Sequence, residues 1–207
     1  MPKAIRVITY IDGFNLYFGL RSKYGRKYLW LDIEKLAHSL IVKPNASIQQ
    51  VKYFTARIRN SPAKEKRQNQ YLEAIETLPS TQLIFGKYYF SERECPACHH
   101  KHKFPSEKMT DVNIAVNMLV DAYEDRYDLA YLISGDSDLS GPIQEIRKRF
   151  PEKIILAAFP PDTKSWELAR VANNHFMIGE RKFARSQFPE KVTSKSGHEL
   201  TKPTTWK

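Results

Sequence analysis

Four aspartates could carry the chemistry of this 207-residue chain. Asp12 and Asp136 each follow an apolar run, Asp138 comes two residues later, and Asp111 opens a helical segment. In an open α/β sheet, ligands bind outside the carboxyl ends of the strands, so we expect these carboxylates to meet there. Like charges a few ångströms apart repel by roughly 4 kcal/mol per pair at an effective dielectric near 20, unless a cation compensates them. Carboxylate oxygens select Mg²⁺ or Mn²⁺.

Taken one at a time, these residues also have structural explanations. Asp12 and Gly13 form a common turn dipeptide, with Asn15 able to face the same crevice. A carboxylate at Asp111 interacts with the helix dipole by ~0.3–1 kcal/mol, and Asp138 could cap the helix that follows it. The helix after Asp111 is apolar nearly all round, however, so its start should pack against the sheet. The combination of aspartates therefore favours a metal site over four separate caps and turns.

Phosphodiester hydrolysis is the chemistry that suits such a cluster. This reaction requires an activated water and a neutralised oxyanion, and a divalent ion can supply both. In two-metal sites the paired ions lie ~3.5–4 Å apart. No histidine or lysine is needed as the base. A serine hydrolase is disfavoured, because Ser137 has no evident His-Asp relay in the sequence.

The composition points to a polyanionic partner. The formal net charge is +10 and the pI is near 9.5, which favours nucleic acid, although many soluble proteins are simply basic. With 42% hydrophobic residues, the chain can build one substantial core. We expect a cytoplasmic protein without a membrane association, because no apolar stretch approaches ~18 residues and the two cysteines do not form a secreted disulfide framework.

Strands and helices alternate along the chain. Apolar, β-branched runs predict strands that are separated by amphipathic helices. The expected strands span residues 5–11, 48–56, 82–90, 129–133, 153–159 and 175–178. This order predicts an α/β fold, a Rossmann-like three-layer sandwich with a central, mostly parallel sheet.

Two segments depart from this alternation. Residues 91–108 lack clear periodicity and are interpreted as an insertion within a domain spanning residues 1–179. Residues 180–207 are polar and basic, and we expect a flexible tail that either tracks a phosphate backbone or is merely solvated.

The insertion contains a compact set of potential zinc ligands. Cys95, Cys98, His99 and His102 lie within one loop, and thiolates with imidazoles bind tetrahedral zinc. The second half of a usual zinc ribbon is missing. A structural Zn²⁺ and free cysteines in a hairpin therefore both remain open.

Three motifs, in this order, give the chain a recognisable resemblance. They are the segments Tyr10–Tyr17 (YIDGFNLY), Lys108–Asn113 (KMTDVN) and Ser134–Leu139 (SGDSDL). Together they resemble the NYN domain family, specifically its bacterial LabA-like branch, whose fold belongs with the PIN-like nucleases. The similarity extends from about residue 5 to residue 178 and leaves the C-terminal segment unmatched.

The resemblance implies a metal-dependent ribonuclease fold. It gives the role of metal ligands to Asp12, Asp111, Asp136 and Asp138. Asn15 and Ser134 are supporting residues. Related PIN nucleases often carry a further acidic residue near the helix after the first strands, and this sequence does not identify one. Whether one metal or two is held therefore stays open.

The leading hypothesis is a Mg²⁺- or Mn²⁺-dependent endoribonuclease acting on single-stranded RNA. A regulatory RNA-binding module with the same fold and little activity is the main alternative. A structure-specific DNA nuclease would share the metal chemistry and differ only in substrate.

Overall fold

The computed structural model describes residues 4–94 and 101–206, with the backbone alone for residues 88–108. Its centre is a six-stranded sheet in which every neighbouring pair of strands is parallel. In spatial order the strands are β3 (Thr81–Phe85), β2 (Ala46–Thr55), β1 (Ile5–Asp12), β6 (Leu129–Ile133), β7 (Ile154–Phe159) and β8 (Asn174–Met177). The predicted three-layer α/β fold is confirmed.

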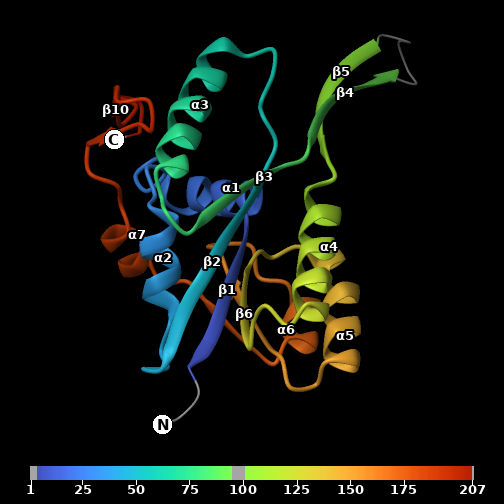
Figure 1. Ribbon diagram of the computed structural model, residues 1–207. Coiled ribbons are helices and arrows are strands. Elements are labelled where there is room, and N and C mark those ends of the chain that lie inside the picture. The colour runs from blue at the N-terminus through green and yellow to red at the C-terminus, as the bar shows by residue number, and fades with distance from the viewer. Residues whose placement is uncertain (1–3, 95–100, 207) are drawn as a thin grey trace.

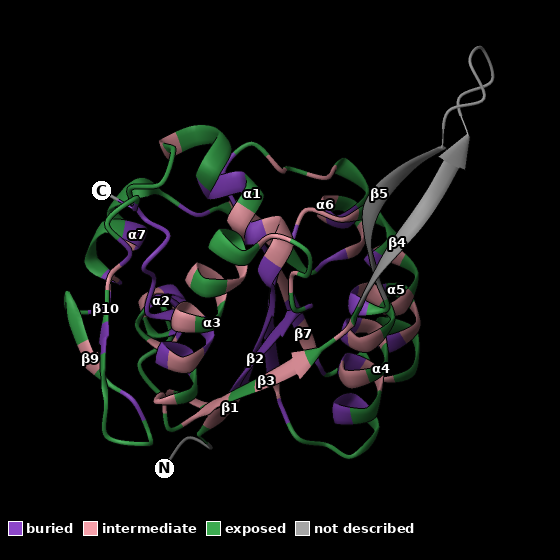
Figure 2. Cartoon of the chain, turned by 90° about the horizontal axis from the view of Figure 1, so that it is seen from above, coloured by how far each residue is buried: buried purple, intermediate pink, exposed green. Residues whose placement is uncertain are grey.

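Helices cover both faces of the sheet (Figure 1). On one face lie α1 (Gly13–Tyr24), α2 (Ile33–Leu40), α3 (Pro62–Glu76) and α7 (Glu180–Arg185). On the other lie α4 (Thr110–Tyr123), α5 (Ser140–Arg149) and α6 (Trp166–Val171), with the short 3-10 helix η1 (Ser137–Leu139). Figure 2 shows buried strands between helices whose outer surfaces are exposed. Because both faces are covered, a central strand such as β6 is apolar and buried at all five residues.

The order of the strands creates a switch point in the middle of the sheet. From β1 the chain continues to β2 on one side, whereas from β6 it continues to β7 on the other. The neighbours β1 and β6 are in register, with Ile11 opposite Ile133. The crevice outside their carboxyl ends is where open α/β sheets bind ligands.

The expected strand at residues 82–90 and the insertion after it are organised differently from the prediction. The strand is split at Gly86, whose backbone N–H donates to the Thr55 carbonyl at 2.7 Å. The chain then leaves the sheet as an antiparallel hairpin of β4 (Lys87–Glu94) and β5 (Lys101–Lys108) (Figure 1). The predicted zinc ligands Cys95, Cys98 and His99 lie outside the described residues, as does the side chain of His102 on β5.

The segment after residue 179, expected to be a flexible tail, is folded in the structure. It forms α7, β9 (Lys191–Thr193) and β10 (Glu199–Thr201), and it buries Phe183 and Trp206 in the core. Trp30 Nε1 donates to the Pro189 carbonyl at 2.7 Å. The polar composition concealed these widely spaced apolar anchors. Among the described residues, no helix is long and apolar enough to cross a bilayer.

Candidate active site

Asp12 lies at the carboxyl end of β1, and its side chain is almost fully buried. One carboxylate oxygen, Oδ1, accepts from the Asn15 backbone N–H at 3.0 Å and so caps helix α1. The other, Oδ2, accepts from the Ser134 hydroxyl at 2.9 Å. Two hydrogen bonds therefore fix a carboxylate at the switch point of the sheet.

Ser134 and Asn15 join the end of β1 to the end of β6. The Ser134 Oγ, which donates to Asp12, also accepts from the Asp136 N–H at 3.1 Å. The Asn15 Oδ1 accepts from the Gly135 N–H at 2.9 Å. Both side chains serve as positioning groups, because they hold the turn after β6 against the turn after β1.

The remaining aspartates lie near this end of the sheet. Asp136 caps η1 by accepting from the Asp138 N–H at 3.0 Å, while Asp138 itself is exposed. Asp111 lies in the first turn of α4 and is partly buried. None of the four aspartates forms an ion pair with a lysine or arginine in the described part of the chain.

Electrostatic coupling shows that the aspartates share one environment. Burial raises the pKa of Asp12 from its ordinary 3.8 to about 6; hydrogen bonds from Asn15 and Ser134 oppose this rise, and the charges of Asp111 and Asp136 add to it. The pKa of Asp111 is also raised, first by burial and then by the charges of Asp136 and Asp138.

The donor set is made of carboxylate oxygens, which fits a hard divalent cation. Among the side chains that the structure describes, no three acidic, histidine or cysteine residues are grouped so as to hold a metal ion. An open arrangement of this kind suits Mg²⁺, which keeps several of its waters and uses one or two protein carboxylates.

Two glycines allow the backbone to approach closely at the site. A Cβ atom at Gly13 would lie 2.6 Å from Cζ of Tyr53. A Cβ atom at Gly135 would lie 1.6 Å from the backbone oxygen of Thr163, in the loop after β7. Neither turn can carry a side chain without a shift of its surroundings.

Sequence reasoning missed a buried charged network beneath α4. Lys52, on β2, donates to Asp121 Oδ2 at 2.6 Å and to Asn117 Oδ1 at 3.0 Å. The Tyr10 hydroxyl, from β1, donates to the same Asp121 oxygen at 2.6 Å. The network joins α4 to the two strands and thereby fixes the helix that carries Asp111. No pattern along the sequence pairs residues 52 and 121.

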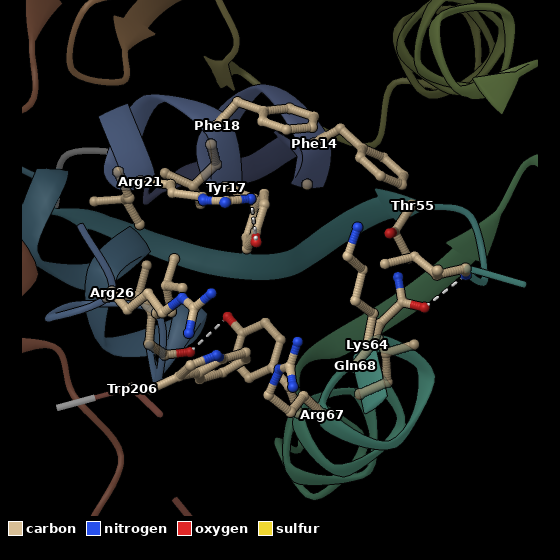
Figure 3. Close-up of a pocket in the computed structure, with 18 of the residues that line it drawn as sticks. Phe14, Tyr17, Phe18, Arg21, Arg26, Thr55, Lys64, Arg67, Gln68 and Trp206 are labelled. Atoms are coloured by element: carbon tan, nitrogen blue, oxygen red, sulfur yellow. Dashed lines mark hydrogen bonds between the residues drawn. The ribbon is translucent and has the colours of Figure 1, made fainter. Parts of the chain in front are cut away.

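Sequence reasoning also missed a cavity of about 500 Å³ at the N-terminal end of helix α1. Gly13 and Phe14, the residues that follow Asp12, line its wall, together with side chains from β2 and α3 (Figure 3). The one available clue was the spacing of Lys64 and Arg67, which places two cations on one face of α3.

Comparison with known proteins identifies the family. The NYN domain model matches residues 6–179. The chain is 27% identical over 178 residues to 6-hydroxy-3-succinoylpyridine 3-monooxygenase HspA of Pseudomonas putida, covering 70% of this chain but only 56% of that protein. A solved structure from Vibrio parahaemolyticus, of a protein of unknown function, superposes with a TM-score of 0.57 at 20% identity, covering 87% of this chain and 96% of that one. The chain therefore belongs to the NYN domain family, and it has that family's nuclease-like fold.

Proposed function

We propose that the protein is a divalent-metal-dependent endoribonuclease that hydrolyses single-stranded RNA in the cytoplasm. The observation that carries this proposal is the set of four aspartates at the switch point, coupled to one another and without a cationic partner among the described residues. Like charges in a partly buried crevice favour a bound cation. Membership of the NYN family supports nuclease chemistry in general.

In this proposal Asp12, Asp111, Asp136 and Asp138 hold Mg²⁺ or Mn²⁺, with Asn15 and Ser134 positioning them. A bound ion supplies an activated water and neutralises charge on the phosphate. Ser134 keeps the Asp12 carboxylate oriented towards the crevice through the 2.9 Å hydrogen bond. The net charge of +10 attracts the RNA backbone to the surface around this acidic site.

The named activity of the Pseudomonas putida relative gives a second candidate, monooxygenation of a substituted pyridine. A cavity lined by aromatic and cationic side chains favours it, because such a cavity also suits an aromatic acid. A monooxygenase consumes O₂ and a reductant. Oxygen uptake in the presence of 6-hydroxy-3-succinoylpyridine and a reduced nicotinamide would support this candidate, and the nuclease proposal predicts none.

The nuclease proposal is tested with end-labelled single-stranded RNA and DNA of one sequence, each incubated with Mn²⁺, Mg²⁺ or EDTA. We expect internal cleavage of RNA that depends on the metal and stops in EDTA. Preferred cleavage of DNA would support the structure-specific DNA nuclease instead. RNA binding without cleavage under every metal condition would support the alternative of a regulatory RNA-binding module.

A further inference from the structure

The cavity begins at the N-terminal end of helix α1, next along the chain to Asp12 of the candidate active site. Gly13 and Phe14 begin helix α1, for which Asp12 is the cap, and both residues line the cavity. Its volume of about 500 Å³ lies within the ~300–1,000 Å³ of small-molecule sites. The wall is completed by α3, by the loop between β2 and α3, and by Trp206 from the folded C-terminal segment (Figure 3).

Five cationic side chains line this cavity and no acidic side chain does. They are Arg21, Arg26, Arg59, Lys64 and Arg67. Among the described residues none of the five forms an ion pair with a carboxylate, although Arg21 donates to the Tyr17 hydroxyl at 3.4 Å. Figure 3 shows the charged ends of Lys64 and Arg67 turned into the cavity. Cations without a carboxylate partner in the described part of the chain complement an anionic group, and guanidinium groups bind phosphate in a bidentate manner.

Aromatic rings lie among these cations. They are Phe14, Tyr17, Phe18, Tyr53, Tyr71 and Trp206. Phe14 and Phe18 are stacked with centroids 6.3 Å apart, and the Phe18 side chain is 57% exposed. An exposed ring beside cations is the arrangement on which proteins stack unpaired bases, worth about 1–3 kcal/mol per base.

The cavity wall is held in place before any ligand binds. Gln68, on α3, accepts from the Ile58 N–H at 2.8 Å and donates to the Ala56 carbonyl at 2.9 Å. The loop that carries Arg59 is thereby tied to α3, which carries Lys64 and Arg67. A preformed wall reduces the ordering cost of binding.

We propose that this cavity binds one unstacked nucleotide of a single-stranded nucleic acid, adjacent to the phosphate that the four aspartates address. The base stacks on the aromatic rings, and its phosphate is held by Arg26, Lys64 and Arg67. A paired base cannot enter, so the cavity confers preference for single strands. This inference rests on the proposed function for the identity of the strand, while binding in the cavity itself requires no metal.

The test is equilibrium titration calorimetry with adenosine 5′-monophosphate in EDTA. Lys64→Ala and Lys66→Ala form a matched pair, because both lysines are exposed on α3, two residues apart, and only Lys64 lines the cavity. We expect Lys64→Ala to weaken binding about tenfold, the loss typical of one hydrogen bond to a charged group, and Lys66→Ala to change it less than about twofold. Ribose 5-phosphate, which lacks the base, should bind about tenfold or more weakly than the nucleotide.

Three results would overturn the inference. Equal effects of the two lysine variants would place the nucleotide elsewhere. Equal affinity for ribose 5-phosphate would reduce the cavity to an anion site without base stacking. Tighter binding of nicotinate, an aromatic carboxylate, than of the nucleotide would assign the cavity to small aromatic acids.

The same variants separate this inference from the nuclease proposal. Metal-dependent cleavage with no nucleotide binding in the cavity would leave the nuclease proposal standing and remove this one. Nucleotide binding that Lys64→Ala weakens, in a protein that cleaves neither RNA nor DNA, would support nucleotide binding in the cavity and remove the nuclease proposal.

Discussion

Asp12 is the residue at which the needs of folding and of the proposed chemistry conflict. Asp12 is 5% exposed, and the charges of Asp111 and Asp136 act on its carboxylate. The hydrogen bonds from Asn15 and Ser134 orient the charged form but do not outweigh its burial, since the pKa is raised to about 6. A protein that only needed a helix cap here could use asparagine at lower energetic cost.

We therefore expect Asp12→Asn to stabilise the metal-free protein near neutral pH. The folded protein takes up a proton at Asp12 between pH 4 and 6, so its unfolding free energy falls as pH rises through this range. At pH 7.5 in EDTA the variant should be more stable by up to about 3 kcal/mol, at about 1.4 kcal/mol per pH unit. Urea unfolding at pH 4.5 and 7.5 measures this, and an identical pH dependence of the two proteins would contradict it.

Gly135 makes a second prediction at this scale. Gly135→Ala must displace the Thr163 backbone, whose oxygen would lie 1.6 Å from the new Cβ atom. We expect a loss of about 1–3 kcal/mol of stability and a loss of RNA cleavage, because the turn carrying Asp136 moves. Gly141→Ala is the control: nothing lies within 4 Å of its Cβ position, and alanine favours helix α5. Retained cleavage in Gly135→Ala would show that this turn tolerates displacement.

At the scale of elements, sequence patterns predicted the framework of the site. The runs that became β1 and β6 are continuous and apolar because both faces of the sheet are covered, so their carboxyl ends could be located from the sequence. The side chains that meet around them could not. Lys52 contacts Asp121 across 69 residues, and the cationic lining of the cavity comes from four separate segments. Only tertiary packing brings these groups together.

The network under α4 should contribute strongly to stability. Lys52→Met removes the buried partner of Asp121 and leaves it the partly exposed Arg126 at 3.3 Å; removing one member of a buried pair costs up to about 3–5 kcal/mol. The double variant Lys52→Met with Asp121→Leu removes both charges and should recover much of that loss. Guanidinium unfolding of the single and double variants measures this. A double variant as unstable as Lys52→Met would show that lost packing, and not the lost lysine partner of Asp121, causes the instability.

For the whole molecule, the C-terminal segment belongs to the folded unit even though the family match ends at residue 179. Trp206 packs against Trp30 and Tyr71, with ring centroids 6.3 Å and 5.8 Å apart. Composition pointed to a flexible tail because lysine, serine and threonine outnumber its few apolar anchors. Among these anchors Trp206 lines the cavity, so the segment contributes to the cavity wall.

Trp206→Ala should accordingly destabilise the protein by about 3–5 kcal/mol, as large-to-small core substitutions do. Trp166→Ala is the matched control, since Trp166 is 71% exposed and its ring lies under the Lys164 ammonium; it should cost less than about 1 kcal/mol. Thermal unfolding of both variants decides the point. Equal melting temperatures would make the segment an appendage that contributes nothing to the core.

The measurement that tests the central claim most directly is RNA cleavage by Asp136→Asn, with Mn²⁺ binding followed by calorimetry on the same samples. Glu152→Gln is the control, because it removes one carboxylate at the opposite ends of the strands, just before β7. We expect Asp136→Asn to lose cleavage and to bind Mn²⁺ at least tenfold more weakly while remaining folded, and Glu152→Gln to match the parent protein. Wild-type cleavage and Mn²⁺ affinity in Asp136→Asn would contradict the proposed site.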